Sequence, residues 1–293
     1  MAIYQIGNGK LAVEVDSRGA ELKSLRRISD GAEYLWYGDE AYWARRSPLL
    51  FPAIGGLKNG EYRVKGQTYH LERHGFIKDT ECKLISQTDT EIWFVAEADE
   101  ASKKLYPFDF RLEIGYRLEG MALKVMWKVE NPSEEPLYFS IGGHPGFNCP
   151  LKEGEKQESY YMAFDVKDSL QSTVIDPDGF AADHAVTYPL EDGITAIKKE
   201  LFEYSTLVME NSQIHKVSLL TPDKKPYITV ELDAPVLAIW TPIEKQAPFI
   251  CIEPWYGLCD LSDFNGTWEE KKWNNALEPG AEFAAGYCIT IEE

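Results

Sequence analysis

Cysteine is scarce in this 293-residue chain, and nothing in its spacing suggests a crosslinked or metal-bound framework. The cysteines are odd in number and include no Cys-x-x-Cys pair: Cys82, Cys149, Cys251, Cys259 and Cys288. This usage is typical of free thiols in a reducing compartment. We therefore expect no disulfide framework and a cytoplasmic protein.

Positive charge is also in short supply. The chain carries 48 acidic and 30 basic residues, which gives a net charge of −18. Such a chain repels phosphate backbones and anionic lipid surfaces, which argues against nucleic acid and membranes as partners. Net charge describes the field of the whole molecule, however, and a local basic pocket for a single phosphate stays compatible with it.

Long apolar runs and targeting patterns are missing as well. The N-terminal stretch "MAIYQIGNGKLAVEV" shows no basic segment ahead of an apolar one, so we expect no signal peptide. No apolar run approaches the roughly 20 residues of a membrane span. A glycine-rich loop that opens a helix is absent too, which argues against a nucleotide-binding Rossmann or P-loop domain.

Helical periodicity is rare, and period-two alternation dominates. Only 39–45 ("DEAYWAR") and 267–276 ("TWEEKKWNNA") suggest short helices. By contrast, "KLAVEV" at 10–15 alternates, and 111–131 predicts two strands joined at Glu119-Gly120. Many short strands with Gly, Asn or Pro about every 10 residues predict an all-β antiparallel sandwich or barrel. The length permits one large domain, and we expect a single domain over 1–293.

Two histidines stand beside glycine or proline residues, which give the backbone special conformations. "ERHGFIKD" at 72–79 follows a predicted hairpin that turns at Lys65-Gly66, and "GGHPGF" spans 142–147. His74 and His144 are the only two of the five histidines followed within a few residues by glycine and phenylalanine. Glycine permits close backbone approach and proline fixes the chain direction, so both rings are site candidates.

A carboxylate stands out in "CIEPWYG" at 251–257. Glu253 ends an apolar run, and an apolar environment perturbs the ionisation of a carboxylate in a way that suits a general base. Trp255 offers a flat apolar face of the kind on which sugar rings stack. The residues alone are equally compatible with a strand-end glutamate beside a packed tryptophan.

A metal site in "HLERH" is an alternative. On a strand, His70, Glu72 and His74 would share one face, although the spacing is not that of a His-Glu-x-x-His zinc helix. His184 and His215 lie in polar loops, and we expect both at the surface.

Taken together, these motifs resemble the aldose 1-epimerases (galactose mutarotases), in particular the bacterial branch with LacX-like proteins. The matching stretches run in order over nearly the whole chain: "RGAELKSL", "RRSPLLFPAIGGL", "HGFIKD", "GGHPGF", "APFICIEPWYG" and "LEPGAEF". The resemblance implies a galactose mutarotase-like β-supersandwich, a sugar substrate, and no metal or organic cofactor. It also implies Glu253 as base, His144 as acid and His74 as a residue that orients the sugar.

Further roles follow from the same resemblance. An arginine of "WARRSPLL" would bind sugar hydroxyls, and the sequence does not decide between Arg45 and Arg46. The chain departs from the branch at Lys78, where arginine is common, and at Ser205, where aspartate is frequent. For His144 to be protonated at neutral pH, we expect a carboxylate neighbour that raises its pKa, Glu253 itself being one option.

Two other functions stay open on the sequence. A hexose-6-phosphate 1-epimerase would need a local basic pocket, for which Arg45, Arg46 and Lys78 are candidates. A non-catalytic sugar-binding or sensing protein would keep the cleft, although it would have no use for the acid–base pair. The sequence is compatible with a monomer or a homodimer.

Overall fold

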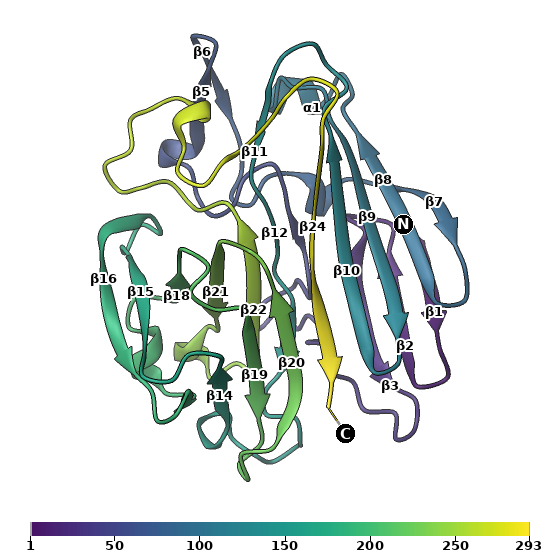
Figure 1. Cartoon of the computed structure of the whole chain (residues 1–293), viewed down its shortest axis with the longest axis vertical. Coiled ribbons are helices and arrows are strands. Elements are labelled where there is room, and N and C mark those ends of the chain that lie inside the picture. Colours follow the sequence, from purple (N-terminus) through teal and green to yellow (C-terminus); the bar gives the residue numbers. More distant parts are fainter. Residues whose placement is uncertain (1, 293) are drawn as a thin grey trace.

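The structure is a computed structural model that describes residues 2–292. Its largest element is a nine-stranded antiparallel sheet that runs across the molecule (Figure 1). In spatial order its strands are β17 (Ile194–Ala196), β14 (Tyr161–Phe164), β19 (Lys216–Leu220), β20 (Pro226–Leu232), β24 (Glu282–Ile291), β10 (Ala122–Glu130), β9 (Arg111–Glu119), β8 (Glu91–Glu97) and β7 (Lys83–Gln87).

A second, six-stranded sheet carries the residues of interest. Its order is β18 (Thr206–Met209), β21 (Val236–Trp240), β22 (Phe249–Tyr256), β12 (Ile141–Gly143) and β4 (Leu49–Leu50), and β13 (Gly146–Asn148) also pairs with β22. A third sheet contains β1 (Ile3–Gly7), β2 (Leu11–Asp16) and β3 (Glu21–Arg27).

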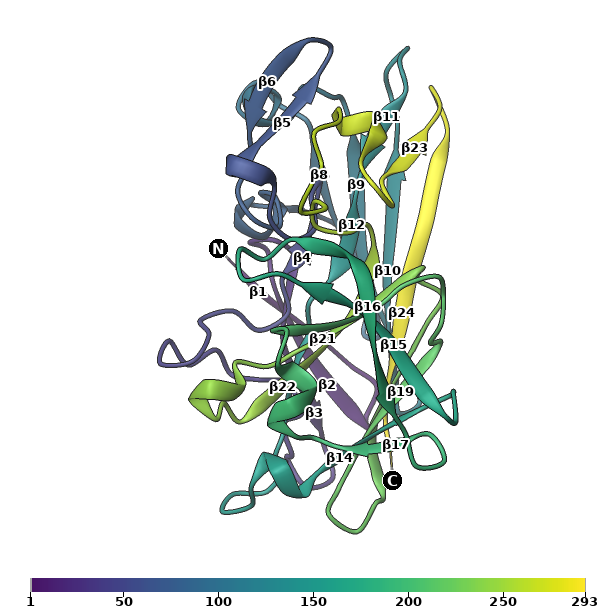
Figure 2. The ribbon, with the colours of Figure 1, turned by 90° about the vertical axis from the view of Figure 1, so that its left-hand side faces the viewer.

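Three strand pairs complete the β-structure: β5 (Glu61–Val64) with β6 (Gln67–His70), β11 (Leu137–Phe139) with β23 (Asn275–Leu277), and β15 (Ser169–Ile175) with β16 (Ala181–Pro189). The β5–β6 hairpin stands at one end of the long axis in both ribbon views (Figures 1 and 2). It turns at Lys65 and Gly66, as the sequence predicts.

Alternation of apolar residues along the strands builds the core between the sheets. In β10, Leu123, Val125, Trp127 and Val129 are buried, while the residues between them are only partly buried. They belong to one continuous apolar cluster that also contains side chains of β2, β3, β9 and β22. Each fully buried aliphatic side chain contributes about 1.5–3 kcal/mol relative to leaving it exposed. The predicted all-β antiparallel class and the 111–131 hairpin are confirmed.

Helical structure is limited to one short α-helix, α1 (Ser102–Leu105), and to 3-10 turns in the part of the chain that the structure describes. The turns are η1 (Lys58–Gly60), η2 (Ile77–Asp79), η3 (Gln157–Ser159), η4 (Lys199–Phe202), η5 (Ile243–Lys245) and η6 (Trp268–Glu270). None of these helices has the length and apolar character that a membrane crossing requires.

The prediction of a helix at 39–45 is wrong. The amides of Tyr42 and Trp43 both donate to the carbonyl of Asp39, which closes one turn. The turn does not continue into a helix, and the carbonyl of Trp43 accepts from the indole Nε1 of Trp36 at 2.8 Å.

The predicted helix at 267–276 is reduced to the 3-10 turn η6. Thr267 and Glu270 form a capping box at its start. The chain then becomes extended at Lys271, whose buried ammonium pairs with Asp260 at 2.8 Å. This ion pair fixes Lys271 where the chain becomes extended, and no further helical turn follows.

Candidate active site

Strand β22 provides the floor of a cavity of about 430 Å³. Its even-numbered residues Ile250 and Ile252 enter the main core. Because side chains alternate along a strand, Cys251, Glu253 and Trp255 share the opposite face, and the last two line the cavity. The complete lining is Trp43, Arg45, Pro48, Leu50, Gly55, Arg73, His74, Lys78, His144, Ile175, Gly179, Ser205, Thr206, Val208, Trp240, Glu253, Trp255 and Cys259.

His144 reaches Glu253 because the neighbouring strand is interrupted beside it. Gly142 in β12 pairs with Trp255, and Gly146 in β13 pairs with Cys251, so the intervening segment with His144 lies next to Glu253. Gly142 is required for this packing, since a Cβ there would lie 2.8 Å from the Trp255 ring. As a result, Nε2 of His144 lies 3.3 Å from Oε2 of Glu253.

His74 lines the same cavity. Its ring meets that of His144 edge to face, with 5.5 Å between the ring centroids. Its Nδ1 accepts a hydrogen bond from the amide of Gly55 at 3.1 Å, so the neutral ring carries its proton on Nε2. The backbone of His74 has a φ of 68°, and its amide donates to the carbonyl of Gly55. The histidines of the two "His-Gly-Phe"-like stretches therefore meet in space.

Burial sets the ionisation of these groups. It lowers the pKa of His144 to about 3 and lowers the pKa of His74 well below its usual value. It also raises the pKa of Glu253 well above its usual value, against the hydrogen bond that Trp255 Nε1 donates to the carboxylate at 3.2 Å. His144 thus has the expected carboxylate neighbour, but the expectation of a raised pKa is wrong because desolvation dominates.

These opposite shifts imply that Glu253 and His144 hold one proton between them over a wide pH range. Below that range both groups are protonated, and above it neither is. In the one-proton form the pair can present a base and an acid at the same time.

Aromatic side chains enclose His144, and the sequence did not identify them. Trp43 lies over the imidazole with 4.8 Å between centroids and a tilt of 31°. Trp240 meets it edge to face at 5.7 Å. Trp43 comes from the turn at 39–45 and Trp240 from the end of β21, so only the long-range packing brings them together.

The structure separates the two candidate arginines. Arg45 lines the cavity, and its guanidinium donates to the carbonyl of Lys78 at 2.9 Å and to Oδ1 of Asp79 at 2.7 Å. Arg46 does not line the cavity, because its guanidinium turns to the carbonyl of Lys23 at 2.6 Å. Lys78 also lines the cavity, and its ammonium donates to the carbonyl of Gly75.

Arg73 is a cavity residue that sequence reasoning missed. The structure gives its guanidinium no hydrogen bond or ion pair with residues 2–292, although it packs close to Gly56 and Gly179. The sequence feature that could have pointed to Arg73 is its position next to His74 in "ERHGF". Ser205, the departure from the branch pattern, lines the cavity with a φ of 67°.

The "HLERH" metal alternative finds no support in the geometry. β6 ends at His70, whose side chain is 75% exposed and lies 3.8 Å from Glu61, while His74 points into the cavity. Within residues 2–292, the three potential metal ligands that do converge are His144, Cys251 and Glu253. His184 and His215 have exposed side chains, as expected. The prediction of a loop at His184 is wrong, because the segment pairs with β15 as strand β16.

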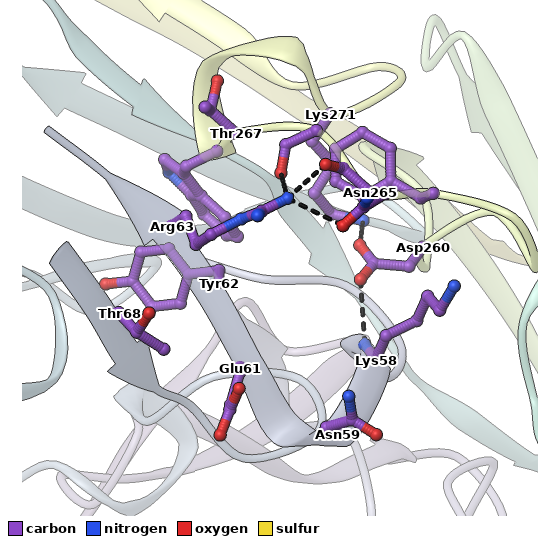
Figure 3. Close-up of a pocket in the computed structure, with 13 residues that line it drawn as sticks. Lys58, Asn59, Glu61, Tyr62, Arg63, Thr68, Asp260, Asn265, Thr267 and Lys271 are labelled. Atoms are coloured by element: carbon purple, nitrogen blue, oxygen red, sulfur yellow. Dashed lines mark hydrogen bonds and ion pairs between the residues drawn. The ribbon is translucent and has the colours of Figure 1, made fainter. Parts of the chain in front are cut away.

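A second cavity of about 270 Å³ lies beside β5 and η6 (Figure 3). Its charged groups bind one another: Asp260 pairs with Lys271 and accepts from the amide of Lys58, and Arg63 donates to Asn265. It contains no histidine. The first cavity is therefore the better candidate for acid–base chemistry.

Comparison with known proteins identifies the family of the chain. The sequence model of the aldose 1-epimerase family matches residues 2–286, so the chain belongs to that family. It is similar to the plasmid-encoded protein LacX of Lactococcus lactis subsp. lactis, with 29% identity over 296 residues that cover 98% of each chain.

Two solved structures share the fold over essentially their full lengths. One is a galactose mutarotase related enzyme from Lactobacillus acidophilus, with a TM-score of 0.93, 34% identity, and coverage of 100% of this chain and 98% of that one. The other is a galactose mutarotase-like protein from Lactobacillus casei, with a TM-score of 0.92, 30% identity, and coverage of 99% and 100%. The fold is thus the galactose mutarotase-like sandwich that the motifs implied.

Proposed function

We propose that this protein is an aldose 1-epimerase that interconverts the α and β anomers of an aldohexose. The observation that carries the proposal is the contact between His144 Nε2 and Glu253 Oε2 at 3.3 Å, inside a cavity that also receives His74. Mutarotation needs a proton removed from the C1 hydroxyl and a proton delivered to the ring oxygen. A paired base and acid at one carbon supply both.

In the proposed reaction, the Glu253 carboxylate takes the proton of the C1 hydroxyl while His144, as imidazolium, protonates the ring oxygen. The bond between C1 and the ring oxygen breaks, and C1 becomes an aldehyde. Rotation about C1–C2 turns the other face of the carbonyl to the C5 hydroxyl. His144 then removes the proton of that hydroxyl, Glu253 returns its proton to the C1 oxygen, and the ring closes as the other anomer.

The proton count favours this cycle. The pair holds one proton, so the reactive form arises when that proton sits on His144 rather than on Glu253. No exchange with solvent is needed, because each half-reaction moves one proton onto the pair and one off it. His74, which stays neutral, would donate from Nε2 to a sugar oxygen and hold C1 in place.

The remaining lining residues would bind the sugar. Arg45 and Lys78 bring donors to one wall, and guanidinium forks suit paired hydroxyls. Trp255 and Trp43 offer flat apolar faces for the C–H groups of the sugar ring.

A phosphorylated aldose is a second candidate substrate, favoured by the charge of the lining. Arg45, Arg73 and Lys78 line the cavity, against Glu253 as its one carboxylate among residues 2–292. The guanidinium N–H groups of Arg73 make no hydrogen bond with other residues within 2–292. Arg73 is exposed and lines the cavity. A 6-phosphate would satisfy those donors.

The decisive experiment is polarimetry of freshly dissolved α-anomers of several aldohexoses, with and without a 6-phosphate. We expect acceleration above the spontaneous rate for at least one sugar. If a phosphate is recognised, Arg73→Gln should raise KM about 10- to 100-fold for the phosphorylated sugar alone, as expected for loss of a charged hydrogen bond. Lys167→Gln, which removes an exposed positive charge elsewhere, is the control. No acceleration of any sugar would contradict the proposed function.

The single domain over 1–293, the cytoplasmic location and the monomeric or homodimeric state stay predictions from the sequence. The same holds for the absence of a required cofactor.

A further inference from the structure

The three ligand atoms of His144, Cys251 and Glu253 lie within 4.8 Å of one another, and all three residues are buried. Cys251 has no part in the proposed reaction and does not line the sugar cavity. It is nevertheless two residues from Glu253 on the same face of β22, and it pairs with Gly146, two residues after His144. The strand register therefore fixes a thiol beside the acid–base pair.

We propose that this cluster is a binding site for a zinc ion, and that zinc inhibits the enzyme by occupying its acid–base pair. An imidazole nitrogen, a thiolate and a carboxylate oxygen are all zinc ligands, and three protein ligands leave a fourth tetrahedral position for water. The cluster borders the cavity, because Glu253 and His144 both line it.

The three ligand atoms need to move only slightly closer together to bind zinc. Bonds of about 2.0–2.3 Å to a tetrahedral zinc place neighbouring ligand atoms roughly 3.3–3.8 Å apart. The His144–Glu253 distance of 3.3 Å already falls there, so Sγ of Cys251 is the atom that must approach. Rotation about one side-chain bond of a cysteine on a rigid strand can supply such a shift.

Zinc binding at this cluster involves no oxidation or reduction, and the bonds that break and form balance. Zinc binding breaks the S–H bond of Cys251 and forms a Zn–S bond. It also displaces the proton that Glu253 and His144 share. Up to two protons pass to solvent, and the bound pair can neither accept nor donate one.

Zinc titration of the metal-free enzyme, prepared by chelation and gel filtration, tests the proposal. We expect reversible inhibition that a chelator relieves. In Cys251→Ser, the zinc concentration for half inhibition should rise at least about tenfold, since even loss of a group that only supports a ligand costs that much. Cys259→Ser, a cysteine that lines the cavity but lies outside the cluster, should keep the sensitivity of the parent protein. Each variant is compared with its own zinc-free rate.

Cobalt(II) supplies a readout that needs neither activity nor a variant. The unaltered protein should develop the near-ultraviolet thiolate-to-cobalt absorption and the intense visible bands of a tetrahedral site. The inhibition arm rests on the proposed epimerase activity, whereas the cobalt arm does not, so failure of one can be told from failure of the other. Absence of the thiolate band, or equal zinc sensitivity of Cys251→Ser and the parent protein, would overturn the proposal.

Discussion

His144 and Glu253 share a contact of 3.3 Å at the floor of the cavity, and burial disfavours a charge on either of them. Their pKa values move in opposite directions, which traps one proton on the pair. This relationship connects the fold to the proposed chemistry, because it follows from the alternation of β22 and from the interruption between β12 and β13.

Replacement of the base should remove most of the activity. Glu253→Gln keeps the shape of the side chain and its acceptor for the Trp255 indole but abolishes its basicity. Loss of a positioned general base costs about 10²–10⁴-fold in rate. Polarimetry of the variant, with circular dichroism as a check of the fold, gives the answer. A near-normal rate would remove Glu253 from the mechanism.

The same substitution should stabilise the fold, and more so at higher pH. Because burial raises the pKa of Glu253, the folded state keeps a proton that the unfolded state loses above about pH 4.3. Stability contributed by the protonated form is present below that pH and is lost as pH rises through the folded pKa. Glutamine does not titrate and escapes this loss.

Urea unfolding at about pH 5 and about pH 8 measures the effect. The gain of Glu253→Gln over the parent protein should be larger at the higher pH. Glu134→Gln, at an exposed carboxylate, should show no such increase. An equal gain at both pH values would mean that Glu253 titrates normally in the fold.

Local pattern predicted the strands and part of the site for identifiable physical reasons. The hairpin at 111–131 is visible because alternation and the turn at Gly120 act within 21 residues. His144 and Glu253 are visible because close backbone approach leaves glycine and proline around them.

The rest of the site depends on long-range pairing. Trp43 and Trp240 have ordinary neighbours in the sequence and become cavity residues only when the sheets assemble. The error at 39–45 has a similar origin, since Trp43 packs against Trp240 and Phe249, which are distant in the sequence. The pKa of His144 could not be read from its neighbours either, because desolvation depends on packing from several strands.

The pH profile of kcat/KM should show no change at the pKa of an ordinary histidine. Since burial lowers the pKa of His144 to about 3, a second proton joins the pair only well below the usual histidine value of about 6.5. We therefore expect kcat/KM of the metal-free enzyme to be flat between about pH 5 and about pH 7. A decline centred near pH 6.5 would show that His144 is not desolvated in the working enzyme.

His144→Asn should change the shape of the profile as well as its height. Without the acid, most of the rate is lost, roughly 10²–10⁴-fold. The residual activity needs only ionised Glu253, so it should rise with pH and show no alkaline limb. If the alkaline limb survived, another group would be the acid.

His74→Ala should weaken positioning without moving either pH limb. His74 stays neutral because burial lowers its pKa well below the usual value, so its proton on Nε2 is fixed over the working range. Loss of that donor misplaces the sugar, and an error of about 1 Å can cost about 10²-fold. His184→Ala, at an exposed histidine, is the matched control. A shifted limb in His74→Ala would assign His74 a proton-transfer role.

Gly75, directly after His74, should tolerate no side chain, and this explains its place in "HGF". Its φ is 70°, and a Cβ would lie 2.1 Å from the carbonyl oxygen of Phe51. That carbonyl accepts the amide of Phe76 at 3.1 Å, so it cannot withdraw without losing the bond that fixes the chain beside His74. Gly75→Ala therefore combines left-handed backbone strain, about 1–2 kcal/mol, with a backbone clash.

Gly120→Ala separates the two effects. Gly120 also has a positive φ, 61°, but a Cβ there meets nothing within 4 Å. It should lose only the backbone term of about 1–2 kcal/mol, whereas Gly75→Ala should lose more than about 3 kcal/mol and most of the activity, because the clash displaces His74. Equilibrium urea unfolding and polarimetry of both variants provide the comparison. Equal losses of unfolding free energy would mean that the carbonyl of Phe51 moves away from the added methyl group. The position of His74 would then not depend on the close approach of these two backbone segments.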